Sequence, residues 1–157
     1  MKTKHRKAAR HKRQWQANPM ASLQLINKLQ PYTDGEQAEF GIHAYAALNN
    51  ITAGNGCPRD LDILTTIANV CLILSEQTHQ ECVDVCLRAG QSIIDAKNRW
   101  RKHARTGFDG AGLQNVRNLL HLHDQYLQKI NPARHDAAYR ETLRRMDAGL
   151  FMQEAAA

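Results

Sequence analysis

The chain has 157 residues, of which 43% are hydrophobic and 23% are charged. This length and composition are typical of one globular domain with its own core, and they exclude a disordered or collagen-like chain. The formal net charge of +6 makes polyanions the first partners to consider.

The positive charge is concentrated at the N-terminus. Residues 2–13 hold seven of the 21 lysines and arginines and no acid, which leaves 14 basic and 15 acidic residues elsewhere. Since residues 1–18 offer almost nothing to bury, we expect them to form a flexible basic arm on a nearly neutral domain. The arm carries the cations Lys2, Lys4, Arg6, Lys7, Arg10, Lys12 and Arg13, followed by Trp15.

We expect a helical domain over residues 19–152, with residues 153–157 frayed. Between Pro19 and Pro31 a short apolar stripe fits either a one- or two-turn helix or an extended strap. The first long helix is predicted after Thr33, because Thr33 and Glu36 have the spacing of a capping box. Its expected core face is Phe40, Ala44, Ala47, Leu48 and Ile51.

A central helix is predicted over residues 60–75, with Pro58 near its first turn. Its apolar residues cover nearly every direction around the helix axis, which is typical of a helix in the middle of a bundle. It is too short and too often interrupted by polar residues to span a bilayer, which needs about 20 mostly apolar residues.

The longest helix is predicted from a second capping box, Thr78-His79-Gln80-Glu81, to about Arg105. A turn-rich connector follows at 106–110. The expected core face of this helix is Cys82, Val85, Cys86, Ala89, Ile93, Ala96 and Trp100.

Two further helices complete the domain, the first over about 111–130. Asn131 and Pro132 then have the positions of a cap and a first helical residue, and Gly149 of a C-terminal stop. The expected core residues are Leu113, Val116, Leu119, Leu120, Leu127, Ile130, Ala138, Leu143, Met146 and Leu150. The fold class is therefore predicted to be all-α, an antiparallel bundle of about five helices with a disordered basic N-terminal arm.

The arm is the main functional lead. Lysines and arginines neutralise phosphates and release counterions, and an exposed Trp15 could stack on an unpaired base. The alternatives are a solubilising tail, or an arm that contacts an acidic protein with Trp15 folded onto the domain.

A second basic cluster lies at the end of the longest helix and consists of Lys97, Arg99, Arg101, Lys102, His103 and Arg105. Of these, Arg99, Arg101, Lys102 and Arg105 are further candidates for phosphate contacts. Cations at this position also complement the helix dipole, which explains them without a ligand. The same two readings apply to a third group, Arg140, Arg144 and Arg145.

His79, Cys82 and Cys86 share one helical face and could supply three zinc ligands, with His121 or His123 as a fourth. Structural sites usually contribute ligand pairs such as CxxC, which are missing here, so no metal or other cofactor is predicted.

His121, His123 and Asp124 suggest a general base beside a carboxylate. Residues two apart on a helix do not face each other, however, and His123 lies on the apolar stripe, which favours a core histidine. The sequence also contains no GxSxG, GxxxxGK[ST], GxGxxG or HExxH motif. The chain is therefore predicted not to be an enzyme.

The four cysteines, at positions 57, 71, 82 and 86, lack the spacing of a disulfide framework. The basic start is not followed by an apolar signal segment. Both features favour a cytoplasmic protein with free thiols and no membrane association.

Several segments resemble a loose group of small helical proteins from phages, prophages and mobile elements of proteobacteria. They are NPM at 18–20, residues 48–56 followed by 60–69, TGFDG at 106–110, LHDQ at 122–125 and RRMDAG at 144–149. Members share a basic N-terminus that ends in an Asn-Pro pair. The resemblance implies a bacterial or phage cytoplasmic setting.

The arm is similar to the arginine-rich arms of lambdoid N-type antiterminators, which place Trp and Asn-Pro just after the basic run. That similarity implies that Arg6, Arg10 and Arg13 contact RNA phosphates and that Trp15 stacks on a hairpin loop. The N proteins are disordered beyond the arm, whereas this chain continues into a packed domain.

The sequence thus predicts a non-enzymatic, nucleic-acid-binding accessory or regulatory protein of a phage or mobile element, whose arm contacts RNA or DNA phosphates. The alternative is a protein–protein interaction module, an inhibitor or adaptor of host machinery, that acts through the helical body. Oligomeric state and the type of nucleic acid stay open.

Overall fold

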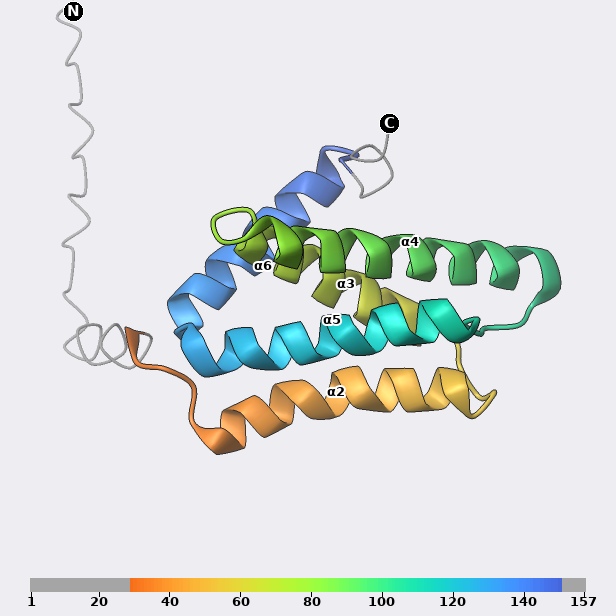
Figure 1. Ribbon diagram of the computed structural model, residues 1–157, viewed down its shortest axis with the longest axis horizontal. Helices are drawn as coiled ribbons and strands as arrows, with labels where there is room; N and C mark the ends of the chain where they lie inside the picture. Colours follow the sequence, from red (N-terminus) through yellow and green to blue (C-terminus); the bar gives the residue numbers. More distant parts are fainter. Residues whose placement is uncertain (1–28, 151–157) are drawn as a thin grey trace, which may run out of the picture.

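The computed structural model describes residues 29–150, so the arm at residues 1–18, the rest of the first 28 residues and residues 151–157 lie outside it. The described part consists of five helices without a strand: α2 (Asp34–Thr52), α3 (Pro58–Ser75), α4 (Gln80–His103), α5 (Gly110–Lys129) and α6 (Pro132–Asp147). Helices α2 to α5 alternate in direction along one bundle, and α6 crosses it at one end (Figure 1). The prediction of an all-α antiparallel bundle is confirmed.

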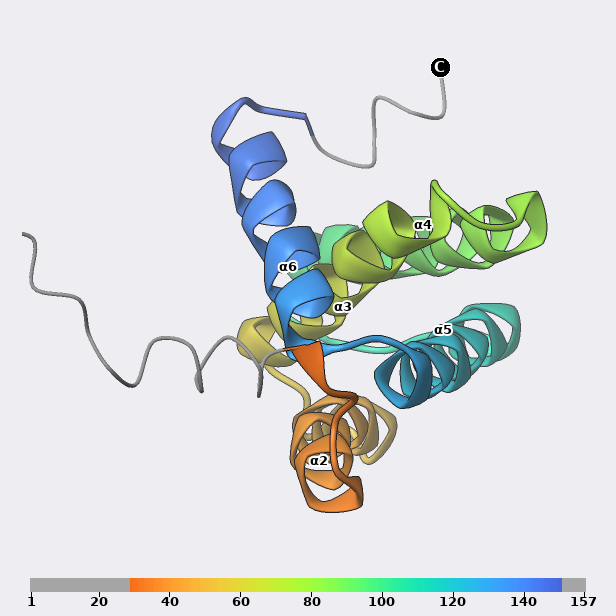
Figure 2. The same cartoon turned by 90° about the vertical axis from the view of Figure 1, so that its left-hand side faces the viewer.

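Helix α3 is the centre of this bundle, and it packs extensively on each of the other four helices. In the view turned by 90° it lies between α2, α4, α5 and α6 (Figure 2). Leu61, Leu64 and Cys71 on this helix are completely or almost completely buried. Burying one leucine side chain contributes about 2–3 kcal/mol, so the burial of α3 contributes substantially to the stability of the core. The predicted central helix is confirmed, beginning two residues earlier, at Pro58.

Two of the predicted helix starts are confirmed by their hydrogen bonds. The Glu36 carboxylate accepts from the Thr33 N–H at 2.9 Å, and the Thr33 hydroxyl accepts from the Glu36 N–H at 3.4 Å. The bonds that the Thr33 N–H and the Thr33 hydroxyl donate to this carboxylate lower the pKa of Glu36. At α6 the Asn131 side chain accepts from the Arg134 N–H at 2.9 Å, and Pro132 is the first helical residue. Both caps satisfy backbone donors that the helix itself leaves unpaired.

The predicted capping box at Thr78 is wrong. Residue His79 is the N-cap of α4, and its side chain makes no capping hydrogen bond. The Thr78 hydroxyl instead donates to the Ser75 carbonyl at 3.0 Å and lies 3.3 Å from the Tyr126 hydroxyl. The turn that follows α3 therefore directs Thr78 back towards the end of α3 and away from the first turn of α4.

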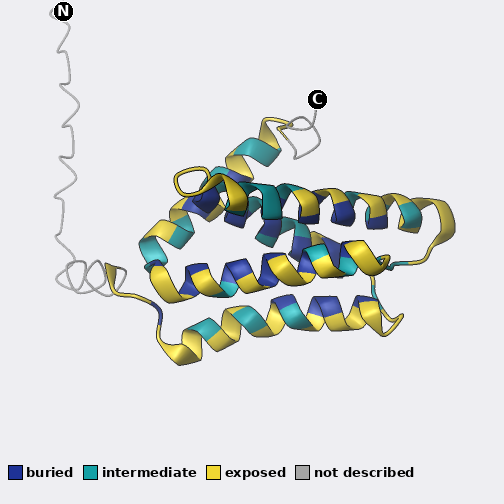
Figure 3. Ribbon diagram, viewed as in Figure 1, coloured by how far each residue is buried: buried dark blue, intermediate teal, exposed yellow. Residues whose placement is uncertain are grey.

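Four side chains predicted to lie in the core are exposed by more than a third of their surface. Phe40 is 41% exposed and Trp100, in the last turn of α4, is 38% exposed. Leu143 and Leu150 are 43% and 50% exposed. Leu143 is exposed because α6 packs extensively on α3 alone, so only one narrow face of α6 is covered. The buried residues of the other helices face the inside of the bundle (Figure 3).

The turn between α2 and α3 is held against the connector between α4 and α5. The Thr106 hydroxyl donates to the Gly56 carbonyl at 2.9 Å. A Cβ added to Gly56 would lie 2.5 Å from Thr106 Oγ1 and 2.8 Å from Ile51 Cα. Since Ile51 Cα is a backbone atom, room for a Cβ at Gly56 can be made only by moving the backbone.

We therefore expect Gly56→Ala to lower the free energy of unfolding by about 1–3 kcal/mol through overpacking. Urea titration followed by circular dichroism measures this change. Gly35→Ala is the matched control, because a Cβ at Gly35 meets nothing within 4 Å and alanine favours the helix. Equal stability of the two variants would show that the Gly56 contact is not tight in solution.

Candidate nucleic-acid interface

The second basic cluster lies at the C-terminal end of α4. There α2 also ends and α3 and α5 begin (Figure 1). The helix is stopped by Ala104, which has the left-handed φ of 53° and donates its N–H to the Trp100 carbonyl at 2.7 Å. The side chains of Arg101, Lys102 and Arg105 are exposed around this stop.

Arg99 has a different position from the other three predicted contacts. It is partly buried, and its guanidinium donates to the Gly107 carbonyl at 2.8 Å. Arg99 therefore holds the connector between α4 and α5 against the end of the helix. Lys97, two residues before Arg99 in α4, pairs with Asp62 at 2.8 Å and so already has an anionic partner.

Within residues 29–150, no acid lies within ion-pair distance of Arg99, Arg101, Lys102 or Arg105. The sequence left two readings of these residues open, helix-dipole partners or phosphate contacts. The geometry is compatible with both, and the exposed charges remain available to a ligand.

An open groove of about 720 Å³ lies beside this cluster. Its lining is Arg99, His103, Arg105, Thr106, Gly107, Phe108 and Asp109. The Asp109 carboxylate accepts from the Gly112 N–H at 2.6 Å and so is engaged as the cap of α5. The groove thus places guanidinium groups beside an aromatic ring, the combination that binds a phosphate together with a neighbouring base.

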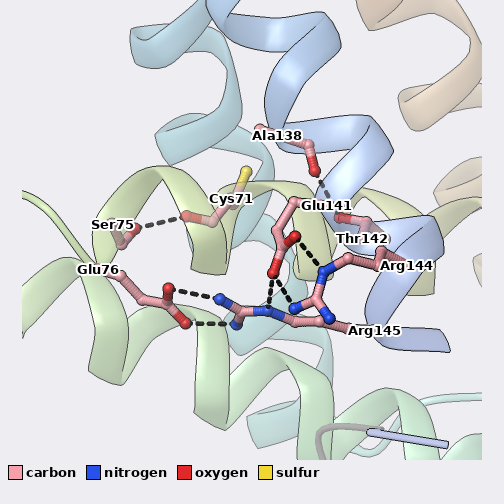
Figure 4. A network of polar contacts seen from close by, with 8 residues as sticks. All are labelled: Cys71, Ser75, Glu76, Ala138, Glu141, Thr142, Arg144 and Arg145. Atoms are coloured by element: carbon pink, nitrogen blue, oxygen red, sulfur yellow. Dashed lines mark hydrogen bonds and ion pairs between the residues drawn. The ribbon is translucent and has the colours of Figure 1, made fainter. Parts of the chain in front are cut away.

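The third basic group is engaged in ion pairs. Arg145 binds both oxygens of Glu76, at 2.6 and 2.8 Å, and so joins α6 to the end of α3 (Figure 4). Arg144 and Arg145 also bind Glu141, and these hydrogen bonds lower the pKa of Glu141 to about 2. Arg140 pairs with an acid of its own helix. These three arginines are therefore structural partners of nearby acids.

The arm residues, Lys2 to Trp15, lie outside the described range, but the point at which the chain enters that range is clear. The Leu29 carbonyl accepts from the Asn131 side chain at 3.4 Å, beside the start of α6. This is the end of the bundle opposite the basic end of α4 (Figure 1). The 19 residues of α2 separate the two ends by about 28 Å. The described part of the chain therefore begins at the end of the domain opposite this basic cluster.

The metal hypothesis gains no geometric support. No group of three His, Cys, Asp or Glu side chains in residues 29–150 is placed to hold a metal ion. His79 is exposed at the start of α4, whereas Cys86 is buried. All four cysteines are free thiols, Cys57 exposed and Cys71 buried.

The histidines of α5 diverge as expected, with His121 exposed and His123 buried. The neighbouring Asp124 carboxylate accepts from the Tyr45 hydroxyl at 2.6 Å. The Asp124 carboxylate is therefore bound to Tyr45 of α2, and it forms no hydrogen bond with His121 or His123 in the described part of the chain.

Sequence reasoning missed the groove itself and its aromatic wall. The connector at 106–110 was recognised only as a turn, although it directly follows the basic run. The exposure of Trp100 was also missed, because its spacing matches the core face of α4.

Burial lowers the pKa of His123 to about 4, and the neighbouring His135 acts in the same direction. The unfolded chain then takes up protons below pH 6.5 that the folded protein does not bind. We expect the free energy of unfolding to fall by about 2 kcal/mol between pH 7 and pH 5 from His123 alone.

His123→Leu should remove this part of the acid sensitivity, as measured by urea titrations at the two pH values. His121→Gln, an exposed change on the same helix, should keep it. If His123→Leu loses as much stability as the unmodified chain between pH 7 and pH 5, His123 is not held neutral by burial.

No protein-family model, curated protein or solved structure matches this chain. Among the helices of residues 29–150, none has the length and apolar character needed to cross a membrane.

Proposed function

We propose that this chain is a non-enzymatic, nucleic-acid-binding accessory or regulatory protein of a phage or mobile element that acts in the cytoplasm. Its basic arm and the basic end of α4 bind phosphates of RNA or DNA. The observation that carries the proposal is the difference between two groups of cations. Arg140, Arg144 and Arg145 of α6 are paired with acids, whereas Arg101, Lys102 and Arg105 are exposed without an ion-pair partner in residues 29–150.

The arm supplies most of the affinity in this proposal. Its seven cations within residues 2–13 can each neutralise a phosphate and release a counterion. Such contacts carry little sequence information, and Trp15 would add stacking on an unpaired base.

The basic end of α4 supplies a fixed surface. Arg101, Lys102 and Arg105 contact phosphates, and the groove beside them offers Phe108 to a base. Trp100, 38% exposed in the same turn, offers a second ring. Aromatic rings between cations are typical of surfaces that bind single-stranded nucleic acid.

The described chain begins, at Leu29, at the end of the bundle opposite the basic end of α4, and this limits the shape of the complex. Either one nucleic acid extends along the domain for about 30 Å, or the arm returns along it. A chain of 28 residues is long enough for the second arrangement, because an extended chain spans about 3.3 Å per residue.

The fixed surface is tested by Arg101→Gln, Lys102→Gln and Arg105→Gln combined in the full chain. Arg99 is left in place, because it holds the connector. We expect affinity for a fluorescent 20-nucleotide RNA or single-stranded DNA to fall at least about tenfold at low salt, with a salt slope smaller by about 2.

The matched control removes three charges elsewhere, by Arg88→Gln, Arg117→Gln and Arg134→Gln. These arginines are exposed, and none forms an ion pair within the described part of the chain. An equal loss in both triple variants would mean that net charge alone matters and that the end of α4 is not a site.

The arm is tested by changing its seven cations to glutamine in the full chain. Loss of most of the binding, together with most of its salt dependence, is the expected result in a fluorescence anisotropy titration. If the unmodified chain binds neither RNA nor DNA at low salt, the proposal fails. A protein partner captured from nuclease-treated bacterial lysate, and kept by the arm variant, would then favour the interaction module.

A further inference from the structure

A small apolar cavity of about 250 Å³ lies between α2, α3, α5 and α6. Its walls include the rings of Phe40, His123, His135 and Tyr139 and the aliphatic side chain of Ile67. The volume suits one six-membered ring with a substituent, since an apolar cavity of about 150 Å³ already accepts benzene. None of these residues belongs to the basic surface described above.

The aromatic wall is an ordered cluster. The rings of Phe40 and His135 meet edge to face, with centroids 5.2 Å apart, and Tyr32 meets Phe40 in the same way at 5.2 Å. The His135 ring is further fixed by the Tyr32 hydroxyl, 3.0 Å from its Nδ1. Edge-to-face contacts of this kind are the ones aromatic rings prefer, so the same walls suit an added ring.

Among the polar side chains that line this cavity, His123 is the one that is buried and has no hydrogen-bond partner in residues 29–150. It is 4% exposed, and its Nδ1 is fully buried without a hydrogen-bond partner in the described part of the chain. Neither nitrogen of the ring forms a hydrogen bond with any described residue, although other buried polar groups nearby do, such as Ser75. A buried polar group without a partner is unfavourable, so a ligand that hydrogen-bonds this ring supplies an interaction that the described residues do not.

The surroundings define the charge of a suitable ligand. The cavity adjoins a wider opening of about 780 Å³, with which it shares Phe40, His43, His135 and Tyr139. Glu36 and Glu39 line that opening, and its single arginine is already paired with Asp136. An anion would therefore meet repulsion at the opening and a neutral imidazole inside.

We infer that this cavity binds a small uncharged aromatic molecule with one hydroxyl group, a phenol. The ring packs against the aromatic wall and Ile67, and the hydroxyl pairs with the His123 imidazole. A hydroxyl can donate or accept, so it serves either tautomer of the ring. This inference is independent of the proposed nucleic-acid binding, because it uses neither the arm nor the end of α4.

The test uses the full chain and three probes, phenol, benzene and benzoate, each titrated at millimolar concentration. Two-dimensional ¹H–¹⁵N spectra follow the amides of α3 and the imidazole nitrogens of His123. We expect phenol to shift both sets of signals, to bind about tenfold more tightly than benzene, and to bind more tightly than benzoate.

Two variants make the test specific. His123→Leu removes the polar partner, so phenol and benzene should bind it equally. Ile67→Phe fills the cavity and should abolish binding of both, while circular dichroism checks that it folds. If Ile67→Phe does not fold, His123→Leu alone decides the question.

The inference is wrong if phenol shifts no signals of the cavity residues, or if benzoate binds as tightly as phenol. It is equally wrong if the preference for phenol over benzene persists in His123→Leu. A loss of nucleic-acid binding in any variant would not bear on this site, since the two are located on different residues.

Discussion

The burial of α3 by four neighbouring helices is the constraint on which the remaining structure depends. A helix with apolar side chains in nearly every direction has no face that water tolerates, so each side must be covered by another element. Helices α2, α4, α5 and α6 each supply one such cover. Because each needs only one apolar face, their outer faces and ends are free to carry polar groups.

Ion pairs are distributed unevenly over those outer surfaces. Arg145 joins Glu76 and Glu141 and so fixes the crossing helix α6, which has an extensive contact with α3 alone. Exposed ion pairs contribute little to stability in general, so a folded chain does not need one for every cation. The last turn of α4 shows this freedom, because Arg101 and Lys102 form no ion pair with any acid of residues 29–150. Binding can therefore use charges that the fold does not require.

Buried polar groups of the domain are mostly paired across helices. The Ser75 hydroxyl lies 2.8 Å from the Tyr126 hydroxyl, and the Tyr45 hydroxyl donates to Asp124. Burial, together with this bond, raises the pKa of Tyr45 to about 12. His123 departs from this pattern, and it does so at the wall of a cavity. An aromatic ligand with one polar group requires an aromatic wall and one hydrogen-bonding group without a partner. The cavity beside His123 offers both within the described part of the chain.

Much of the helical framework is readable from local signals. The capping residues Thr33 and Asn131 and the continuous apolar run of α3 specify their elements directly, since caps and periodicity act within a few residues. Thr78 shows the limit of that reasoning. Its spacing to Glu81 matches a capping box, but the turn after α3 directs its hydroxyl to Ser75 and Tyr126. Residues from three different helices or turns decide that choice.

The sequence by itself determined the helices, the central place of α3 and the concentration of charge in the first 13 residues, because all three depend on neighbours in the chain. It could not determine which arginines are paired, since Glu76 and Arg145 are 69 residues apart. Nor could it place His123 beside His135 and Phe40, or Leu29 at the end of the bundle opposite the basic end of α4. These relations arise only when the helices pack, because packing alone sets the distances between side chains that are remote in sequence.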